Sequence, residues 1–173
     1  MAYSKKELRQ AYIARLQQLD LNTRLYEERK LASLLYDQPE WTGAKTIAVT
    51  LSQSFEIDTE PIILHARHKG QQIVVPRTLP HRQMEFVELN EDTDFDETSF
   101  GILEPHDGKV YSPDEIDLMV VPGVAFTASG NRLGFGVCYD YVLFSNILFG
   151  KGLGRWNTIP TFLRSSSTST PFA

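Results

Sequence analysis

The sequence predicts one α/β domain with a mainly parallel central sheet flanked by helices. Its 173 residues can bury a single continuous core without disulfides or metals. Two β-branched runs, Thr46–Leu51 and Gln72–Pro76, are separated by the helical segment Glu60–His68. Lys69-Gly70 is expected to close this helix, and Pro76 to end the second run. A strand, a helix and a second strand at this spacing fit one crossover unit of a parallel sheet. The run Asp117–Val121 indicates a further strand in the centre of a covered sheet.

Two helices are expected before the first strand. Ser4 and Glu7 have the spacing of a capping box, which predicts a helix over Lys5–Gln18. Leucines at helical spacing predict a second helix over Thr23–Tyr36. Positive charge in the first turns of a helix opposes the helix dipole. Basic residues at that place therefore either form a solvated basic face or bind an anion. The first turns of the first helix hold Lys5, Lys6 and Arg9.

The remaining segments alternate between strand and loop signals. The segment Asp37–Gly43 is expected to break the second helix. Met84–Leu89 alternates strictly between apolar and polar residues, as a strand with one solvent-facing side does. The acidic segment Asn90–Thr98 predicts a solvated loop or a short turn, and Phe100–Pro105 predicts an extended piece. Tyr139–Phe149 has helical spacing.

Charge and composition exclude several classes of function. A net charge of −5 argues against a general nucleic-acid binder, which needs a basic surface. Cys138 is the only cysteine, so no intramolecular disulfide forms and a reducing compartment is favoured. No signal-peptide core and no apolar run of membrane-spanning length is present, so we expect a cytoplasmic protein that does not enter a membrane.

A glycine-containing turn follows the last predicted strand. Arg132 precedes Gly134 and Gly136, and glycines let a backbone approach an anion closely. Arginine can bind a phosphate with two hydrogen bonds. The Gly-x-Gly pattern alone is also typical of an ordinary tight turn, so it needs support from other residues.

That support comes from a set of motifs spread over the chain between Lys5 and Asp140. The segment Asn131–Gly136 followed by Tyr139-Asp140 resembles the signature of the 5-formyltetrahydrofolate cyclo-ligase (methenyltetrahydrofolate synthetase) family. Further matches occur in the family's order, at Lys5 and Arg9, Ser52–Thr59, Val75-Pro-Arg77, Met84 and Gly101–Pro105.

The resemblance implies a three-layer α/β domain over residues 1–150 and assigns roles to individual residues. Arg132 and Tyr139 are implied as catalytic residues, and Asp140 as the magnesium ligand. Contacts to the folate are implied for Leu51, Glu56 and Tyr139, with Glu56 holding the pterin ring. Contacts to ATP are implied for Lys5, Arg9, Arg132, Leu133, Gly134, Phe135, Gly136 and Tyr139.

The implied reaction converts 5-formyltetrahydrofolate to 5,10-methenyltetrahydrofolate at the expense of ATP, with Mg²⁺ and with release of ADP and phosphate. The formyl oxygen attacks the γ-phosphate, and N10 then displaces phosphate from the activated carbon. Such chemistry asks the protein for positioning and charge neutralisation. The implied partners are the folate and ATP, and the expected assembly is a monomer.

Two departures from the family pattern leave alternatives open. Val137-Cys138 makes the glycine loop one residue shorter and removes a third glycine, and valine is poorly suited to positive φ. The segment after Tyr141 carries no Asp or Glu, although residues 1–140 carry all 22. Residues 151–173 therefore predict an atypical, poorly ordered tail, and one hypothesis is a frameshifted or truncated frame that leaves the sheet without the family's C-terminal strand.

Three functions are therefore carried forward from the sequence. The first is an active cyclo-ligase. The second is a degenerate relative that binds nucleotide or folate without turnover. The third is another enzyme of phosphorylated ligands on a similar sheet, such as a relative of sugar-phosphate isomerases or CoA-transferases.

Overall fold

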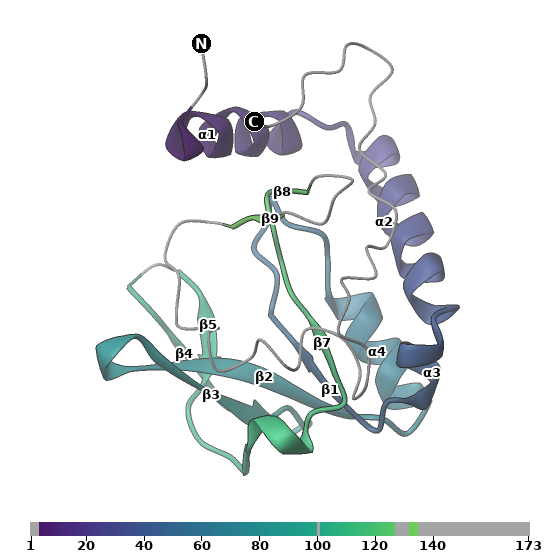
Figure 1. Ribbon diagram of the computed structural model, residues 1–173, viewed down its shortest axis with the longest axis vertical. Coiled ribbons are helices and arrows are strands. Elements are labelled where there is room, and N and C mark those ends of the chain that lie inside the picture. The colour runs from purple at the N-terminus through teal and green to yellow at the C-terminus, as the bar shows by residue number, and fades with distance from the viewer. Residues whose placement is uncertain (1–3, 100, 127–131, 135–173) are drawn as a thin grey trace.

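The computed structural model describes residues 4–99, 101–126 and 132–134 (Figure 1). Within them the helices begin with caps that the sequence encodes. Ser4 and Glu7 form the predicted capping box before α1, and Asp20 accepts a hydrogen bond from the Thr23 amide before α2. The α-helices are α1 Lys5–Gln17, α2 Leu21–Tyr36, α3 Pro39–Gly43 and α4 Glu60–His68.

The central sheet has five strands in the order β6-β3-β2-β1-β7. Strand β1 pairs in parallel with β2 and with β7, whereas β2–β3 and β3–β6 are antiparallel. Two small antiparallel pairs, β4–β5 and β8–β9, lie outside it. The strands are β1 Thr46–Val49, β2 Gln72–Leu79, β3 Gln83–Glu88, β4 Phe95–Glu97, β5 Leu103–Pro105, β6 Val110–Tyr111, β7 Leu118–Val120, β8 Ala125–Phe126 and β9 Arg132–Leu133, with short 3₁₀ turns at Pro80–Arg82 and Pro113–Glu115.

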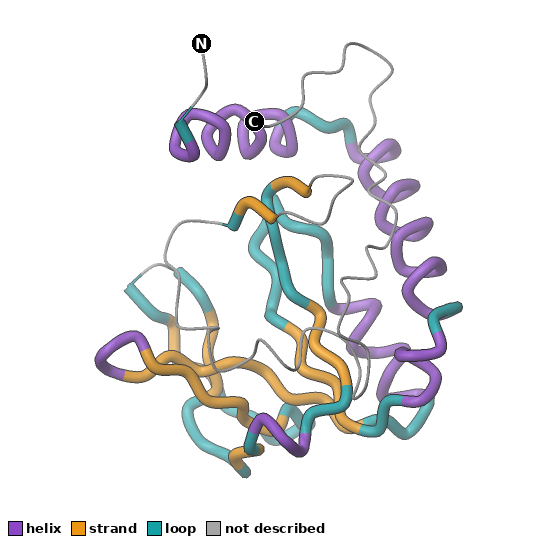
Figure 2. The backbone as a smooth tube through the Cα atoms, in the orientation of Figure 1, coloured by secondary structure: helices purple, strands orange, loops and turns teal. Residues whose placement is uncertain are grey.

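The main core lies between one face of the sheet and α2, α3 and α4. Alternate strand residues such as Ile47 and Ile73 pack there against Leu35, Trp41 and Ile63, one from each helix. Figure 2 shows the three helices gathered along the same side of the strands. Burial of these large apolar side chains holds α2, α3 and α4 against the sheet.

The opposite face of the sheet carries a second, smaller apolar cluster. It contains Ala48, Val74, Phe86 and Met119, which are the strand residues that alternate with those of the main core. Burial on both faces explains why β1 reads as a continuous apolar run rather than an alternating one.

The prediction of a mainly parallel sheet is wrong for the described residues, because two of the four strand pairs are antiparallel. Pro76 was expected to end the second strand, but β2 continues to Leu79. Beyond Val74 the strand no longer pairs with β1, so it is an edge there and a proline costs no ladder hydrogen bond. Strand β3 pairs with β2 from Val74 to Leu79, which keeps the second half of β2 in the sheet.

Two further expectations need correction. The segment Asp37–Gly43 is not only a break, since Pro39 starts the short helix α3, which buries Trp41 in the core. The acidic segment Asn90–Thr98 contains strand β4, which pairs with β5 although all three of its residues are exposed. The predicted helix stop at Lys69-Gly70 is confirmed, and Gly70 takes a φ of 73°.

No described helix combines the length and apolarity that a membrane crossing requires. The expected helix Tyr139–Phe149 and the expected tail 151–173 lie outside the described residues.

Candidate functional site

Two chain segments leave the sheet side by side. Strands β1 and β7 are adjacent and parallel, so the loop 50–59 and the segment 121–126 both start at the same end of these strands. Strand β1 leads through α4 to β2 on one side, while β7 lies on its other side. Ligands of open α/β sheets bind at such a point, outside the carboxyl ends of the strands. Figure 1 shows both segments running toward α1.

Helix α1 is joined to this edge by Arg9. Its Nε donates a hydrogen bond of 2.8 Å to the carbonyl oxygen of Gly134, a residue 125 positions later in the chain. Lys5 lies one helical turn before Arg9 and therefore on the same face of α1. The structure thus joins Arg9 to Gly134, and the phosphate site that the resemblance implies for Lys5 and Arg9 stays a prediction.

The β8–β9 hairpin presents Arg132 and Leu133 next to that contact. The amide of Val124 donates to the carbonyl oxygen of Leu133 at 2.8 Å, and Arg132 Nη1 donates to the carbonyl oxygen of Pro122 at 3.4 Å. The Arg132 side chain crosses directly over Gly123. A Cβ at Gly123 would lie 2.9 Å from Arg132 Cγ and 2.6 Å from the Phe126 ring, so any larger residue there would force these side chains to shift.

Glu56 lies in the loop 50–59 and is half-buried. Its Oε2 accepts a hydrogen bond of 2.8 Å from the Gln53 amide, and its own amide donates to the Gln53 carbonyl at 2.9 Å. Burial raises the pKa of the Glu56 carboxyl above its usual value of 4.5, and the Gln53 bond offsets part of that shift. Within residues 4–99, 101–126 and 132–134, Oε1 and the remaining lone pair of Oε2 have no hydrogen-bond partner, so a polar ligand can bind there.

The base of this loop is closed by Thr59. Its Oγ1 donates to the Thr50 carbonyl at 2.8 Å and accepts from the Ser52 amide at 3.1 Å, and the Thr59 amide donates to Ser52 Oγ at 3.2 Å. Leu51 sits within this closure and packs against the main core. The loop therefore leaves the sheet from a fixed neck.

Sequence reasoning missed two residues of α2 that contact the loop. Arg24 donates from Nη1 to the Ser54 carbonyl and from Nη2 to the Glu56 carbonyl, each at 2.5 Å. Glu28 Oε1 accepts from Arg24 Nε at 2.9 Å and from the Asp58 amide at 3.2 Å. The available signal was an Arg-Glu pair at i,i+4, which is common on helix surfaces and carries no hint of a distant partner.

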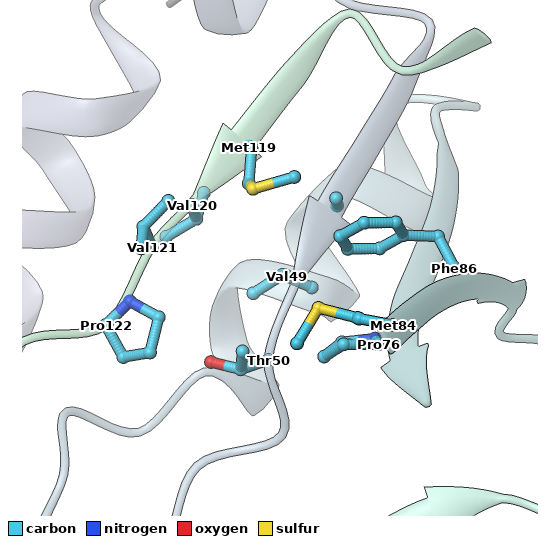
Figure 3. A pocket seen from close by; sticks show the side chains of 10 residues that line it. Val49, Thr50, Pro76, Met84, Phe86, Met119, Val120, Val121 and Pro122 are labelled. Atoms are coloured by element: carbon cyan, nitrogen blue, oxygen red, sulfur yellow. The ribbon is translucent and has the colours of Figure 1, made fainter. Parts of the chain in front are cut away.

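A small apolar pocket opens at the same edge of the sheet (Figure 3). Among the described residues that line it, Thr50 is the one polar residue, and the Thr50 carbonyl is also an anchor of the Glu56 loop. Pro122, which accepts the Arg132 bond, borders the pocket from the segment after β7. The other lining residues are Ala48, Val49, Pro76, Met84, Phe86, Met119, Val120 and Val121.

Four predicted site residues lie outside the described residues. They are Phe135, Gly136, Tyr139 and Asp140. Over residues 4–99, 101–126 and 132–134 no three His, Cys, Asp or Glu side chains converge as metal ligands. The described part of the site thus consists of cationic side chains, backbone groups, one half-buried carboxylate and an apolar pocket.

Comparison with known proteins identifies the family. Residues 1–152 match the 5-formyltetrahydrofolate cyclo-ligase family. The chain belongs to that family. A 5-formyltetrahydrofolate cyclo-ligase from Mus musculus is 30% identical over 144 residues, which are 79% of this chain and 71% of the mouse protein. A probable 5-formyltetrahydrofolate cyclo-ligase from Caenorhabditis elegans is 28% identical over 149 residues, covering 82% of this chain and 72% of the relative.

Solved structures of the family agree with the fold. The 5,10-methenyltetrahydrofolate synthetase of Aquifex aeolicus superposes with a TM-score of 0.70 at 28% identity, covering 83% of this chain and 73% of that protein. The synthetase from Mycoplasma pneumoniae gives a TM-score of 0.60 at 18% identity and covers 78% and 73% of the two chains. The chain is therefore an α/β member of an enzyme family, with a mixed central sheet.

Proposed function

We propose that this protein converts 5-formyltetrahydrofolate to 5,10-methenyltetrahydrofolate, consuming ATP and releasing ADP and phosphate. The observation that carries the proposal is the hydrogen bond from Arg9 to Gly134. It supports the proposal because it joins α1 to the segment that carries Arg132. The chain reaches that segment from β7, which is adjacent to β1, the strand before the Glu56 loop. One sheet edge then offers cations for a polyphosphate and a carboxylate for a polar ring, which is what a folate and ATP require together.

The phosphate side of the proposed site is built from α1 and β9. Lys5 and Arg9 supply positive charge from one helix face, and Arg132 supplies it from the hairpin. Backbone groups of Leu133 and Gly134 are the other described groups on this phosphate side. We assign Phe135, Gly136 and Tyr139 to the same ATP site on the resemblance of the motif alone.

The folate side is built on the loop after β1. We propose that Glu56 accepts hydrogen bonds from the N–H groups of the pterin ring, because its Oε1 is not used by Gln53. The apolar pocket beside Thr50 is too small to hold a ring, so we propose that it supplies only an apolar wall beside this loop. Leu51 packs into the core, so its contribution is to fix the start of the loop as well as to contact substrate. Tyr139 is proposed as a further folate contact.

The proposed reaction has two steps. The formyl oxygen on N5 forms a bond to the γ-phosphorus and ADP leaves with the broken P–O bond. N10 then attacks the formyl carbon and loses its proton, and the oxygen departs as part of inorganic phosphate. Arg132 and the other cations neutralise charge on the transferring phosphoryl group, and Tyr139 is assigned to the reacting centre.

Asp140 is the proposed magnesium ligand. Mg²⁺ in nucleotide sites is held by one or two carboxylates together with phosphate oxygens, so a single aspartate beside a phosphate site has suitable donor chemistry. When bound, the ion would neutralise phosphate charge. The chain's own residues then have to hold the two substrates in line and exclude water.

We also propose a monomer in the cytoplasm, acting on small molecules rather than on nucleic acid or membranes. The domain is proposed to span residues 1–150, with 151–173 as an atypical tail. The family match over residues 1–152 supports this boundary.

The test is a turnover assay with 5-formyltetrahydrofolate, ATP and Mg²⁺, followed by the absorbance of methenyltetrahydrofolate. Product should form only when all three are present. Binding of both substrates without product would replace the proposal by the degenerate alternative, and failure to bind either would reject the family activity for this chain. Arg132→Ala serves as the inactive reference.

A further inference from the structure

The pair Arg24–Glu28 on α2 is the least expected feature beside the site. These side chains touch neither the apolar pocket nor the phosphate-side residues among the described contacts. They hold instead the backbone of the loop that presents Glu56. Arg24 is 28% exposed and Glu28 only 14%, so both are more enclosed than an ordinary surface pair.

We propose that Arg24 and Glu28 form a clamp that positions Glu56 for the folate, an inference that rests on the proposed function. The clamp holds three alternate residues of the loop, Ser54, Glu56 and Asp58. Arg24 takes the carbonyl oxygens of Ser54 and Glu56, and Glu28 takes the amide of Asp58. Glu56 is the middle one of these three residues, so the clamp fixes the backbone from which its carboxylate extends.

Guanidinium geometry explains why arginine is suited to this position. One planar group donates in three directions, from Nη1 and Nη2 to two loop carbonyls and from Nε to Glu28. Glu28 in turn fixes the plane of the guanidinium while accepting a loop amide. A lysine would keep the charge but supply a single flexible ammonium, which cannot hold both carbonyls and the carboxylate in one plane.

The clamp complements the two restraints that the loop makes by itself. Thr59 closes the neck, and the Gln53–Glu56 bonds form a turn inside the loop. Neither fixes that turn against the rest of the protein. The α2 contacts do so, and α2 is anchored to the main core through Leu35. Arg24 therefore acts on the folate through Glu56, as a positioning residue.

Positioning makes a different prediction from a purely structural role. Loss of the clamp should weaken folate binding while the KM for ATP and kcat at saturating folate stay near the wild-type values. We expect Arg24→Ala to raise the Kd and KM for 5-formyltetrahydrofolate by about tenfold, which corresponds to about 1.4 kcal/mol. Arg24→Lys should show most of this loss, because charge alone does not replace the fork.

The deciding experiment is a double-mutant cycle of Arg24→Ala and Glu56→Ala, read by equilibrium binding of 5-formyltetrahydrofolate and by hydrogen exchange of the loop amides. If the clamp acts through Glu56, Arg24→Ala adds no further loss of affinity once Glu56 is gone, and exchange at residues 53–58 rises in Arg24→Ala while that of β1 is unchanged. The matched control is Arg29→Ala, an exposed arginine of the same helix.

Fully additive losses, or wild-type affinity and exchange in Arg24→Ala, would overturn the clamp. A comparable rise of the ATP KM would overturn it as well, because it would indicate general loosening of the fold. Failure of the proposed function is recognised separately, since it shows in the wild-type protein as absent folate binding. Without folate binding in the wild type, the clamp proposal is rejected together with the proposed function, whatever the hydrogen-exchange data show.

Discussion

Arg9 on the first helix and Gly134 after the last described strand are joined by a hydrogen bond of 2.8 Å between Nε and the carbonyl oxygen. This bond fixes a helix that buries none of its residues fully. Within the described residues, this bond joins α1 to the rest of the site, while apolar side chains of α1 such as Tyr12 and Leu16 are half-buried. The positive first turns of α1, unfavourable for an isolated helix, are placed beside the proposed phosphates.

Arg9→Ala should impair ATP use more than folate use. The substitution removes both the positive charge and the bond to Gly134, and a hydrogen bond to a charged group contributes about 1.5–3 kcal/mol. We expect the KM for ATP to rise about tenfold or more. Lys6→Ala, an exposed neighbour on the same helix, is the control and should leave it unchanged. Equal KM values for ATP in wild type and Arg9→Ala would contradict the phosphate assignment.

Gly123→Ala should displace Arg132 without unfolding the protein. The added Cβ would lie 2.9 Å from Arg132 Cγ and 2.6 Å from the Phe126 ring, both of which are side chains that can shift. The KM for ATP should rise about tenfold if Arg132 binds phosphate, because a displaced arginine loses its two-point contact. Gly43→Ala is the control, since a Cβ there meets nothing within 4 Å. Unchanged ATP kinetics in Gly123→Ala would remove Arg132 from the site.

Local signals in the sequence predicted local structure well. The capping box of Ser4 and Glu7 placed the start of α1, and Lys69-Gly70 placed the end of α4. These devices depend on residues within one turn of one another. The order of motifs likewise identified the family that the comparisons then matched.

Contacts between distant segments could not be predicted in the same way. A proline inside a strand looks like a stop until the pairing shows that β2 is an edge at Pro76. The Arg24–Glu28 pair reads as a helix-surface ion pair because its targets lie about thirty residues away in the chain. The sequence motif predicts Glu56 as a folate contact, but it gives no indication of what holds its loop.

Thr59→Val should loosen the neck of the loop. Valine matches threonine in shape but leaves the Ser52 amide and the Thr50 carbonyl without their hydroxyl partner. A buried group that loses its partner costs about 1–3 kcal/mol, so the melting temperature should fall by about 2–4 °C for each kcal/mol. Thr59→Ser keeps the hydroxyl and should retain the folate KM. A Thr59→Val protein as stable as wild type would show that the neck bonds contribute no net stability.

Glu56→Gln should stabilise the protein at neutral pH while weakening folate binding. Burial raises the folded-state pKa of this carboxyl above the 4.5 of an unfolded glutamate. Between these two values the folded state binds more protons than the unfolded state, so the stability of the wild type falls as pH rises through that window. A neutral glutamine avoids this loss and can still accept the Gln53 bond. The variant's advantage should therefore be present at pH 7 and disappear below pH 4.5.

Thermal unfolding of the wild type, Glu56→Gln and Glu91→Gln across this range measures the effect. Glu91 is exposed in a loop, so its substitution controls for the general loss of one negative charge. The same window governs the ligand, because only the ionised carboxylate of Glu56 accepts hydrogen bonds with both oxygens. Folate affinity of the wild type should fall on acidification at a pH above that of an ordinary glutamate, and the affinity of Glu56→Gln should be low and without this step. A pH-independent stability difference would place the Glu56 carboxylate in water rather than in a half-buried site.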